Sequence, residues 1–429
     1  MTSWNTRGRQ DNFLFYSTFL ETFFTRFPSL SSVCIVVAKK LSKSDQKMKI
    51  ALINNWPITS GVGRYAFTLF NLLKSLRSDI KIDHYFINRE KRALYLISDK
   101  DVVLSYARRN PIIDNIVLMK YKLSNLFLDY RLGKLIPDDY DLYHITNQNM
   151  SFMNHYKNIG TNIITVHDLI YLTSPTNFME KAFNKLVYKG LKTSDFLISI
   201  SNSTKHDLIE YFNIPKEKIK VIPHGVDHDV FKPLTQSEIK DIYTKYNIDK
   251  GYQYILHIGS SLPRKNLYVL IMSIYKLIKK FNMKNIKLLK INHVDKNSIE
   301  LVKRLRLERF IKIIEYVPEE DLPKIYNLAD VFVFPSTYEG FGFPPLEAMA
   351  CGTPVITSNT SSLPEVVGDA GIMLDPNDVD SFARAIYRVL TNEDLREDMI
   401  ERGLKRAKKF SWERCAKETL DVYKEVVEG

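Results

Sequence analysis

From residue 48 to the C-terminal end, short apolar runs rich in β-branched residues alternate with amphipathic helical patterns. In a doubly wound fold such alternation produces a parallel sheet covered by helices on both faces. Helices are expected at 65–76, 178–191 and 203–212. Strands are expected at 49–53, 81–87, 141–145, 162–166, 196–200, 219–222, 252–258, 286–291, 312–316, 331–334, 354–357 and 371–374. The pattern predicts an α/β fold with two doubly wound, Rossmann-like domains facing a central cleft.

One segment separates the two alternating series. PHGVDHDVFKPL, residues 223–234, leaves a strand without entering a helix and is punctuated by Pro and Gly, as expected of an inter-domain connection. The predicted parts are an N-terminal domain, a C-terminal domain and a last helix capped by Ser411, at 48–230, 231–410 and 411–429. Ligands of such sheets bind beyond the carboxyl ends of strands, so functional residues are expected just after the strands.

Residues 1–47 differ from the rest of the chain. They contain seven basic and three acidic residues and two short apolar runs, NFLFYSTFLETFF and SLSSVCIVVA. A signal peptide would need a cleavage site of the A-x-A type, which does not follow the run. An amphipathic helix on a membrane surface is a second interpretation. We favour a third: the sequence from Met48 resembles a natural chain start, and 1–47 is an N-terminal extension without a role in catalysis.

The stretch NNWPITSGVGRYAF contains a G-x-G-x-x-A pattern made by Gly61, Gly63 and Ala66. This pattern binds dinucleotides when it directly follows a strand. Here seven residues, 54–60, separate it from the predicted strand. The acidic residue about twenty positions on, Asp83, stands near the start of its strand rather than at the carboxyl end. A nicotinamide or flavin cofactor is therefore disfavoured.

A small-residue turn with two cations follows the first strand of the second half. In GSSLPRKN, residues 259–266, small side chains let backbone N–H groups approach a ligand, and Arg264 and Lys265 can neutralise a diphosphate. Taken alone, a solvated turn with surface charges explains this pattern better.

A second turn brings two glutamates to the same edge. Glu339 follows a buried strand, and the turn GFGFPP leads into a helix beginning near Pro344 or Pro345, where Pro suits the first turn. Glu347 stands eight residues after Glu339 on that helix. The helix N-terminus and glycine-exposed amides favour an anion here, while Glu347 can accept two hydrogen bonds from a vicinal diol such as a ribose.

Composition narrows the function without deciding it. Hydrophobic residues make up 45% and charged residues 26% of the chain, and the net charge is +12 with a pI near 9.2. This surface suits anionic partners, but no basic run with interleaved aromatics indicates nucleic acid. The three scattered cysteines fit a reducing cytoplasm, and no run approaches the about 18 apolar residues of a membrane span.

Two D-x-D strings, at 227–229 and 378–380, have the spacing of a carboxylate pair that could hold a metal and a diphosphate. One stands in the predicted linker and the other precedes a helix, so capping explains both better. No metal site is expected.

Several motifs together resemble one enzyme family. EGFGFPPLEAMACGTPVIT resembles the signature of retaining, nucleotide-sugar-dependent glycosyltransferases of family 4 (glycosyl transferases group 1), which have the GT-B fold. GSSLPRKN is similar to the phosphate-binding loop of that family and SSLPEVVGDAGIMLDP to its next segment. VIPHGVD is similar to its domain-crossing motif, VHDL and ISISNSTKHDL to N-terminal motifs, and FSWERCAKETLDVYKEV to its last helix. The resemblance covers about residues 48–429 and is densest over 252–376.

The resemblance implies roles for individual residues. Arg264 and Lys265 would bind the donor diphosphate, Glu339 the donor sugar hydroxyls and Glu347 the nucleotide ribose. His167, which ends a strand, would face the donor sugar; a satisfied core histidine is the alternative. Backbone contacts to the sugar, the phosphates or the acceptor across the cleft would come from Gly61, Gly63, Gly340, Phe341, Gly342 and Phe343. The role of Glu365 is left open.

The reaction implied is retaining transfer of a hexose without a metal or cofactor. We favour same-face attack by the acceptor hydroxyl, with the departing phosphate taking its proton. VHDLIYL is similar to the segment of mannosyl-transferring members, which favours GDP-mannose; UDP-glucose and related donors stay open. The acceptor would be a glycan or lipid-linked hydroxyl in the cytoplasm.

A peripheral contact with the inner face of the cell membrane is a further expectation. It rests on the basic, apolar segment 119–136, although an ordinary core-facing helix explains that segment better.

Three other functions compete with this prediction. A sugar-nucleotide epimerase would use the same donor site without an acceptor. A nicotinamide dehydrogenase would carry an absorbing reduced cofactor. A non-catalytic glycan- or membrane-binding protein would keep its function after Glu339→Gln.

Overall fold

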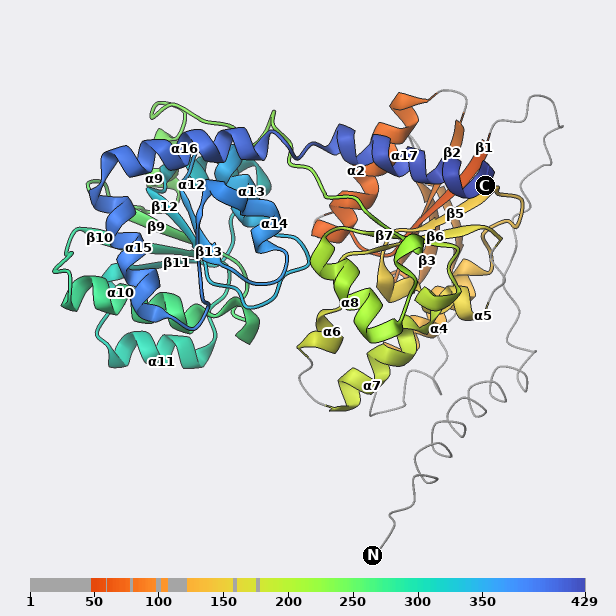
Figure 1. Cartoon of the computed structure of the whole chain (residues 1–429), viewed down its shortest axis with the longest axis horizontal. Coiled ribbons are helices and arrows are strands. Elements are labelled where there is room, and N and C mark those ends of the chain that lie inside the picture. Colours follow the sequence, from red (N-terminus) through yellow and green to blue (C-terminus); the bar gives the residue numbers. More distant parts are fainter. Residues whose placement is uncertain are drawn as a thin grey trace, which may run out of the picture.

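The structure is a computed structural model that describes residues 48–58, 60–77, 80–97, 102–106, 122–156, 160–174 and 178–428. The expected extension, 1–47, lies outside the described residues. The described chain forms two α/β halves placed side by side, each built on one sheet, as the sequence predicts (Figure 1). The last helix returns from the second half to the first (Figure 1).

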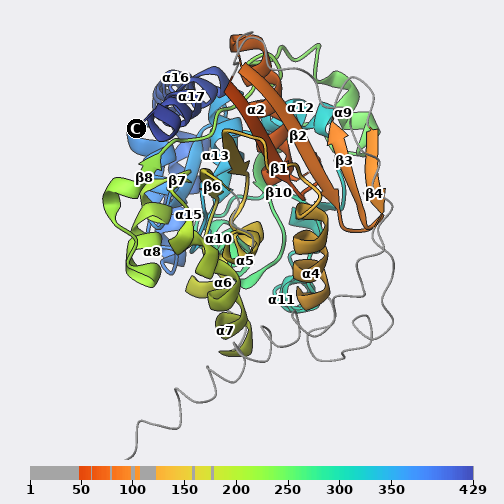
Figure 2. The same cartoon turned by 90° about the vertical axis from the view of Figure 1, so that its right-hand side faces the viewer.

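Over the residues that the structure describes, the first sheet has eight strands in the order β4-β3-β2-β1-β5-β6-β7-β8. Six of them run parallel, whereas β3 pairs antiparallel with both β2 and β4. Figure 2 shows β3 and β4 at one edge of the sheet, beyond β2. The strands are β1 Met48–Asn54, β2 Ile80–Asn88, β3 Ala93–Ile97, β4 Val102–Tyr106, β5 Leu142–Ile145, β6 Asn162–Val166, β7 Phe196–Ser199 and β8 Ile219–Val221. The two edge strands were not predicted, since they lie outside the strand–helix alternation.

The helices of the first half are α2 Gly61–Leu76, α4 Lys122–Gly133, α5 Phe152–Tyr156, α6 Ile170–Thr173, α7 Phe178–Val187 and α8 Asn202–Phe212, with 3-10 turns at Gln148–Met150, Tyr188–Thr193 and Lys216–Lys218. Helix α2 begins earlier than predicted because the hydroxyl of Ser60 accepts a hydrogen bond from the Gly63 N–H. Helix α4 buries Leu126, Leu128 and Leu132 in the core of the domain, which supports the core-facing interpretation of that segment.

The second sheet has six parallel strands in the order β11-β10-β9-β12-β13-β14. Its strands are β9 Gln253–Ile258, β10 Ile286–Ile291, β11 Ile311–Ile314, β12 Val331–Phe334, β13 Val355–Ser358 and β14 Ile372–Leu374. The chain winds outward from β9 in one direction and from β12 in the other. The strand order therefore reverses between β9 and β12, which is where doubly wound sheets bind ligands.

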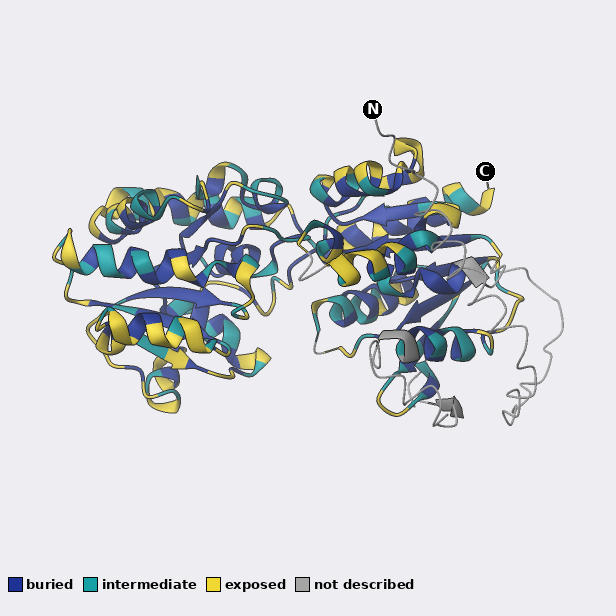
Figure 3. Cartoon of the chain, turned by 90° about the horizontal axis from the view of Figure 1, so that it is seen from below, coloured by how far each residue is buried: buried dark blue, intermediate teal, exposed yellow. Residues whose placement is uncertain are grey.

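Helices cover both faces of the second sheet, and strands of both sheets are buried between such layers (Figure 3). They are α9 Lys240–Lys245, α10 Leu267–Lys279, α11 Lys296–Arg304, α12 Leu322–Leu328, α13 Phe343–Ala350, α14 Leu363–Val367, α15 Val379–Thr391 and α16 Glu393–Ala407, with 3-10 turns at Pro263–Lys265, Glu308–Phe310, Glu319–Asp321 and Gly368–Ala370. Separate apolar cores lie on the two faces of each sheet.

The chain crosses between the halves at two neighbouring places. Helix α17, Trp412–Glu428, packs on α2 of the first half, burying Trp412 and Tyr423 beside Tyr65. Val226 of the first crossing pairs with Ser411 of the second, and a Cβ on Gly225 would lie 2.1 Å from the Trp412 nitrogen. The crossings therefore fit together only with glycine at 225. The predicted cap is confirmed, since the Ser411 hydroxyl accepts from the Arg414 N–H at 3.2 Å.

Candidate active site

Two cations and a carboxylate meet where the strand order of the second sheet reverses. Arg264 and Lys265 stand on the 3-10 turn after β9, and Glu339 follows the neighbouring strand β12. The Glu339 Oε1 atom lies 3.0 Å from Arg264 Nη1 and 2.6 Å from Lys265 Nζ. One carboxylate oxygen therefore pairs with both of the cations that the family resemblance assigns to the donor diphosphate.

The lysine of this cluster is buried and firmly placed. Lys265 is only 8% exposed, and burial lowers its pKa while the Glu339 charge opposes that shift. Its ammonium lies 4.7 Å from the centre of the Phe334 ring. The buried Lys290 ammonium donates to the carbonyls of Gly259 and Ile291, each at 2.6 Å, which fixes the start of the loop that carries Lys265. Lys290 was not predicted.

Two serines hold the turn after Glu339. The Glu339 N–H donates to the Ser361 hydroxyl at 2.9 Å, and the Ser362 hydroxyl bonds to the carbonyls of Glu339 and Phe341 at 2.9 and 2.6 Å. Gly342, just before α13, has a φ of +129°, which favours glycine. Neither serine was predicted to have this role. Both lie within SSLPEVVGDAG, where two adjacent hydroxyls before a helix could have indicated side chains that hold a neighbouring turn.

The same turn touches the first domain. A Cβ on Gly340 would lie 2.1 Å from the His167 carbonyl oxygen, so glycine is required for this approach. The Tyr338 hydroxyl donates to Asp207 at 2.6 Å and accepts from the Leu169 N–H at 3.3 Å. The carboxyl end of β6 and the turn after β12 therefore face each other directly, across the two halves.

His167 stands at the carboxyl end of β6, but its ring is fully engaged. Nε2 lies 2.8 Å from the Thr146 carbonyl, to which it donates, so Nδ1 accepts from His224 Nε2 at 3.1 Å. Burial lowers the His167 pKa to about 4, which keeps the ring neutral near pH 7. To meet a sugar hydroxyl, the ring must give up one of these two bonds. Burial raises the pKa of the next residue, Asp168, and the nearby charge of Arg264 opposes only part of that rise.

The phenylalanine side chains of the turn join the two halves. The Phe343 ring stacks on His224 with centroids 5.3 Å apart and planes 12° apart, and Trp412 and Phe341 pack against the same histidine. A Cβ on Gly61 would touch the Phe343 ring at 3.6 Å. Gly61 therefore lies opposite the beginning of α13, across the two halves.

The placement of the two N-terminal glycines corrects one expectation. Gly61 and Gly63 lie in the first turn of α2 rather than in a loop, because the Ser60 cap starts the helix there. A Cβ on Gly63 would lie 1.9 Å from the Pro57 carbonyl oxygen. Close packing of the loop against the helix thus requires glycine at 63.

Glu347 lies on α13, is 6% exposed and faces a cation of the other half. Its Oε2 accepts from the Tyr326 hydroxyl at 2.7 Å, and its Oε1 lies 3.4 Å from Arg64 Nη1. Arg64 Nη2 also lies 2.6 Å from Glu319. Burial raises the Glu347 pKa, while the Arg64 charge and the Tyr326 hydrogen bond oppose the rise. Arg64 and Tyr326 were not predicted.

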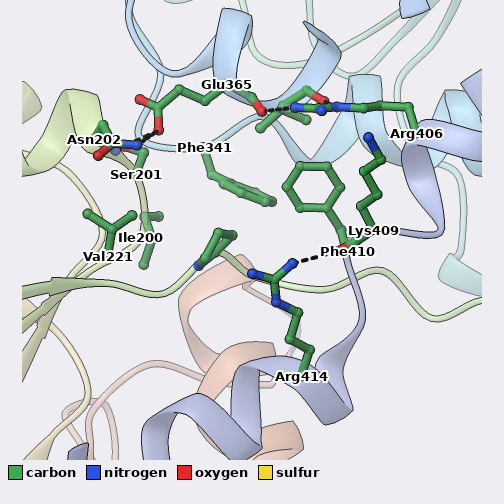
Figure 4. Close-up of a pocket in the computed structure, with 12 residues that line it drawn as sticks. Ile200, Ser201, Asn202, Val221, Phe341, Glu365, Arg406, Lys409, Phe410 and Arg414 are labelled. Atoms are coloured by element: carbon green, nitrogen blue, oxygen red, sulfur yellow. Dashed lines mark hydrogen bonds between the residues drawn. The ribbon is translucent and has the colours of Figure 1, made fainter.

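Glu365, whose role the sequence left open, lies in the second half and forms hydrogen bonds with the first half. Its carboxylate accepts from the Asn202 N–H at 2.6 Å (Figure 4) and from the Ser203 N–H at 2.7 Å, both at the N-terminus of α8. A cavity of about 340 Å³ lies here, lined by Phe341, Phe410 and the cationic side chains of Arg406, Lys409 and Arg414 (Figure 4). Of the predicted site residues only Phe341 lines it. The cavity is therefore distinct from the cluster around Glu339.

The aspartates of the D-x-D strings cap local structure, as predicted. Asp227 accepts from the Asp229 and Val230 N–H groups at 3.0 and 3.2 Å, and Asp378 accepts from the Ser381 N–H at 2.9 Å. Among the described residues, no group of three or more His, Cys, Asp or Glu side chains is arranged to hold a metal ion. No helix within the described ranges is long and apolar enough to span a bilayer.

Two doubly wound sheets with this cluster of strand-end residues define a two-domain α/β enzyme of the GT-B type. The family model "Glycosyltransferase Family 4" matches residues 59–230, and "Glycosyl transferases group 1" matches residues 238–406. O-antigen chain mannosyltransferase B of Escherichia coli is 33% identical over 387 residues, which cover 86% of this chain and 97% of the relative. The chain therefore belongs to the glycosyl transferases group 1 family, and it is a transferase.

Solved structures of the same fold agree. Sucrose-phosphate synthase from Thermosynechococcus elongatus superimposes with a TM-score of 0.71 at 21% identity, covering 88% of this chain and 99% of that one. HepE of Anabaena, solved with UDP and glucose, gives a TM-score of 0.65 at 16% identity, covering 88% and 100%. At these identities the likeness shows the fold alone. It confirms the predicted GT-B architecture.

Proposed function

We propose that the protein transfers a mannosyl group from GDP-mannose to a hydroxyl of a glycan or lipid-linked acceptor, retaining the anomeric configuration and using no metal. The observation that carries the proposal is the cluster of Arg264, Lys265 and Glu339 between β9 and β12. Similarity to a mannosyltransferase supports mannose, and the UDP and glucose held by HepE support a nucleotide-sugar donor.

The cluster suits a leaving nucleoside diphosphate. As the bond between the anomeric carbon and the phosphate oxygen breaks, negative charge grows on the diphosphate, and fixed cations and amide dipoles stabilise it. Arg264 and Lys265 supply the cations, and the N-terminus of α13 supplies the dipoles. When the phosphates take over these cations, the Glu339 carboxylate is released to accept hydrogen bonds from the sugar hydroxyls.

The nucleoside would lie along α13. Tyr326 fixes one oxygen of Glu347, so the other can accept a ribose hydroxyl. His167 and the turn at Gly340 would border the sugar, because they meet where the two halves face each other.

We propose attack on the same face as the leaving group. The acceptor oxygen forms a bond to the anomeric carbon, the bond to the phosphate oxygen breaks, and the acceptor proton passes to that phosphate oxygen. A covalent double displacement would need a carboxylate free to bond the anomeric carbon. In this proposal the Glu339 carboxylate, paired with two cations before the donor binds, instead takes up hydrogen bonds from the sugar hydroxyls.

The proposal is tested with a panel of sugar nucleotides, with and without an oligomannoside acceptor and EDTA. The expected result is release of GDP from GDP-mannose, unaffected by EDTA, with an α-linked product by NMR. Loss of turnover in EDTA or a β-linked product would contradict the mechanism. Conversion to another sugar nucleotide without acceptor would identify an epimerase instead. An absence of turnover with every sugar nucleotide would overturn the function.

A further inference from the structure

Arg64 of the first half reaches across to the expected ribose carboxylate of the second. It is the fourth residue of α2, 2.6 Å from Glu319 and 3.4 Å from the Glu347 Oε1 atom. Its third nitrogen, Nε, is buried and has no hydrogen-bond partner. The arginine therefore holds Glu347 by one long contact only.

The other partner of Arg64 is weakly placed. The Glu319 side chain is 61% exposed, and an ion pair with so exposed a carboxylate contributes little. Neither partner binds the guanidinium through two parallel bonds, which is the arrangement that makes arginine pairs strong. The contacts of Arg64 are therefore easily exchanged for those of a ligand with several anionic oxygens.

A nucleotide sugar would compete for this arrangement. A ribose diol needs the Oε1 atom of Glu347, because Tyr326 already occupies Oε2. The start of α2 lies opposite the start of α13, since Gly61 faces the Phe343 ring. A guanidinium displaced from Glu347 thus stands beside the helix N-terminus at which the diphosphate would bind.

We propose that Arg64 exchanges partners on donor binding: it leaves Glu347 and pairs with the diphosphate, as a third cation supplied by the first half. In the absence of Arg64, the two positive charges of Arg264 and Lys265 are half neutralised by the single negative charge of Glu339. Guanidinium geometry fits phosphate oxygens in pairs, which a lysine cannot reproduce. The exchange links donor binding to the contact between the two domains. This inference rests on the proposed function.

The test compares binding of a nucleoside diphosphate with binding of its nucleoside. Calorimetric titrations with GDP and guanosine, and with UDP and uridine, are made on the wild type, Arg64→Gln, Arg64→Lys and Glu319→Gln. In Arg64→Gln the affinity for the diphosphate is expected to fall by about 10- to 100-fold, as for loss of one charged hydrogen-bond donor. At a pH well above the Glu347 pKa, affinity for the nucleoside should stay the same or rise, because Arg64 no longer competes for the Glu347 carboxylate.

Glu319→Gln is the matched control, because it removes an ion-pair partner of Arg64 and keeps the arginine. It should bind the diphosphate at least as tightly as the wild type. If Arg64 served only to join the domains, Arg64→Gln and Glu319→Gln would weaken binding alike, and nucleoside and diphosphate would suffer equally; either result overturns the inference. If Arg64→Gln does not fold, Arg64→Lys decides, with a smaller loss confined to the diphosphate.

The experiment separates the two levels of the proposal. Wild-type protein that binds neither GDP nor UDP overturns both the proposed function and the exchange. Wild-type protein that binds GDP or UDP, with unchanged binding in Arg64→Gln, overturns the exchange alone.

Discussion

At the scale of single residues, the candidate active site consists of charged side chains that already pair with one another within the protein. Glu339 holds Arg264 and Lys265 through one oxygen, and Glu347 is held by Arg64 and Tyr326. Buried charges are stable only when paired, so each expected ligand contact replaces one made within the protein.

Replacing the shared carboxylate should separate binding from turnover. In Glu339→Gln, Arg264 and Lys265 lose their competitor, so the affinity for GDP is expected to stay or rise. Turnover should fall by about 100-fold or more, in the range seen when a positioned transition-state contact is removed. Calorimetry and a GDP-release assay measure the two effects. Glu393→Gln, which breaks an exposed pair with Arg396, is the neutral control. Full turnover in Glu339→Gln would remove this residue from the mechanism.

The raised pKa of Glu347 predicts how donor affinity depends on pH. In the proposed site the ionised carboxylate would accept from the ribose through the oxygen that Tyr326 leaves free, so donor affinity should be complete above the raised pKa and be lost as the pH falls through it. Arg64, Tyr326 and Glu319 are the charged or titratable groups that act on it. Because the Arg64 charge lowers the Glu347 pKa, Arg64→Gln should move the acid limb to higher pH. The measurement is guanosine affinity against pH; an unmoved limb would contradict it.

The same shift affects stability in the opposite direction. A carboxyl whose native pKa is raised stabilises the fold below its unfolded pKa, and this contribution is lost as the pH rises through the native pKa.

Residues that follow strands were predictable, whereas partners across the halves were not. Arg264, Lys265, Glu339 and Glu347 stand at positions fixed by the local strand-turn-helix pattern. Arg64 and Glu347 are 283 positions apart, and their contact depends on how two separately folded sheets face each other. The partners of the His167 ring nitrogens were not predicted either, because they follow two other strands of the same first sheet and are distant along the chain.

At the scale of elements, the N-terminus of α8 is capped twice. Ser201 caps it from within, accepting from the Thr204 N–H at 3.1 Å, and Glu365 of α14 caps it from the other half. A carboxylate at a helix N-terminus satisfies free N–H groups and the helix dipole together. Glu365 thus ties α14, which follows the serines that support Glu339, to the first half.

Removing this tie should affect catalysis more than stability. Glu365→Ala is expected to lose about 1 kcal/mol of unfolding free energy, as for a capping residue. Because the contact joins the halves, the Glu365→Ala substitution should also raise the KM for the donor. Asp378→Ala removes a cap of α15 within one half, so it should cost similar stability without changing KM. Equal KM values in the two variants would show that the contact has no part in placing the domains.

Elements were predicted best where they alternate strictly. The bounds expected for β6, β10 and β12 agree with the structure, because each is a short β-branched run between turns. Strands β3 and β4 were missed because an antiparallel edge has no helix between its strands. The beginning of α2 was missed because Gly61 and Gly63 disfavour a helix locally, while the Ser60 cap and packing on Pro57 outweigh that preference.

At the scale of the whole molecule, the two crossings lie against each other at Gly225. Gly225→Ala would place a Cβ 2.1 Å from the Trp412 nitrogen, which must push the crossings apart and shift α17. We expect a lower melting temperature and reduced turnover. Gly160→Ala is the matched control, because its Cβ would meet a Tyr143 ring at an ordinary 3.7 Å. Wild-type stability and turnover in Gly225→Ala would show that the crossings tolerate separation.

The sharing of the Glu339 carboxylate between two cations also has a consequence for which ligands bind and how the product is released. A bare anion that displaces Glu339 from Arg264 and Lys265 strands a nearly buried carboxylate without partners. In the proposed reaction a nucleotide sugar would avoid this, because its hydroxyls would give the carboxylate new donors as its phosphates take the cations. Once the sugar had passed to the acceptor, those donors would be gone. Glu339 would then return to its two cations and help to release the nucleoside diphosphate.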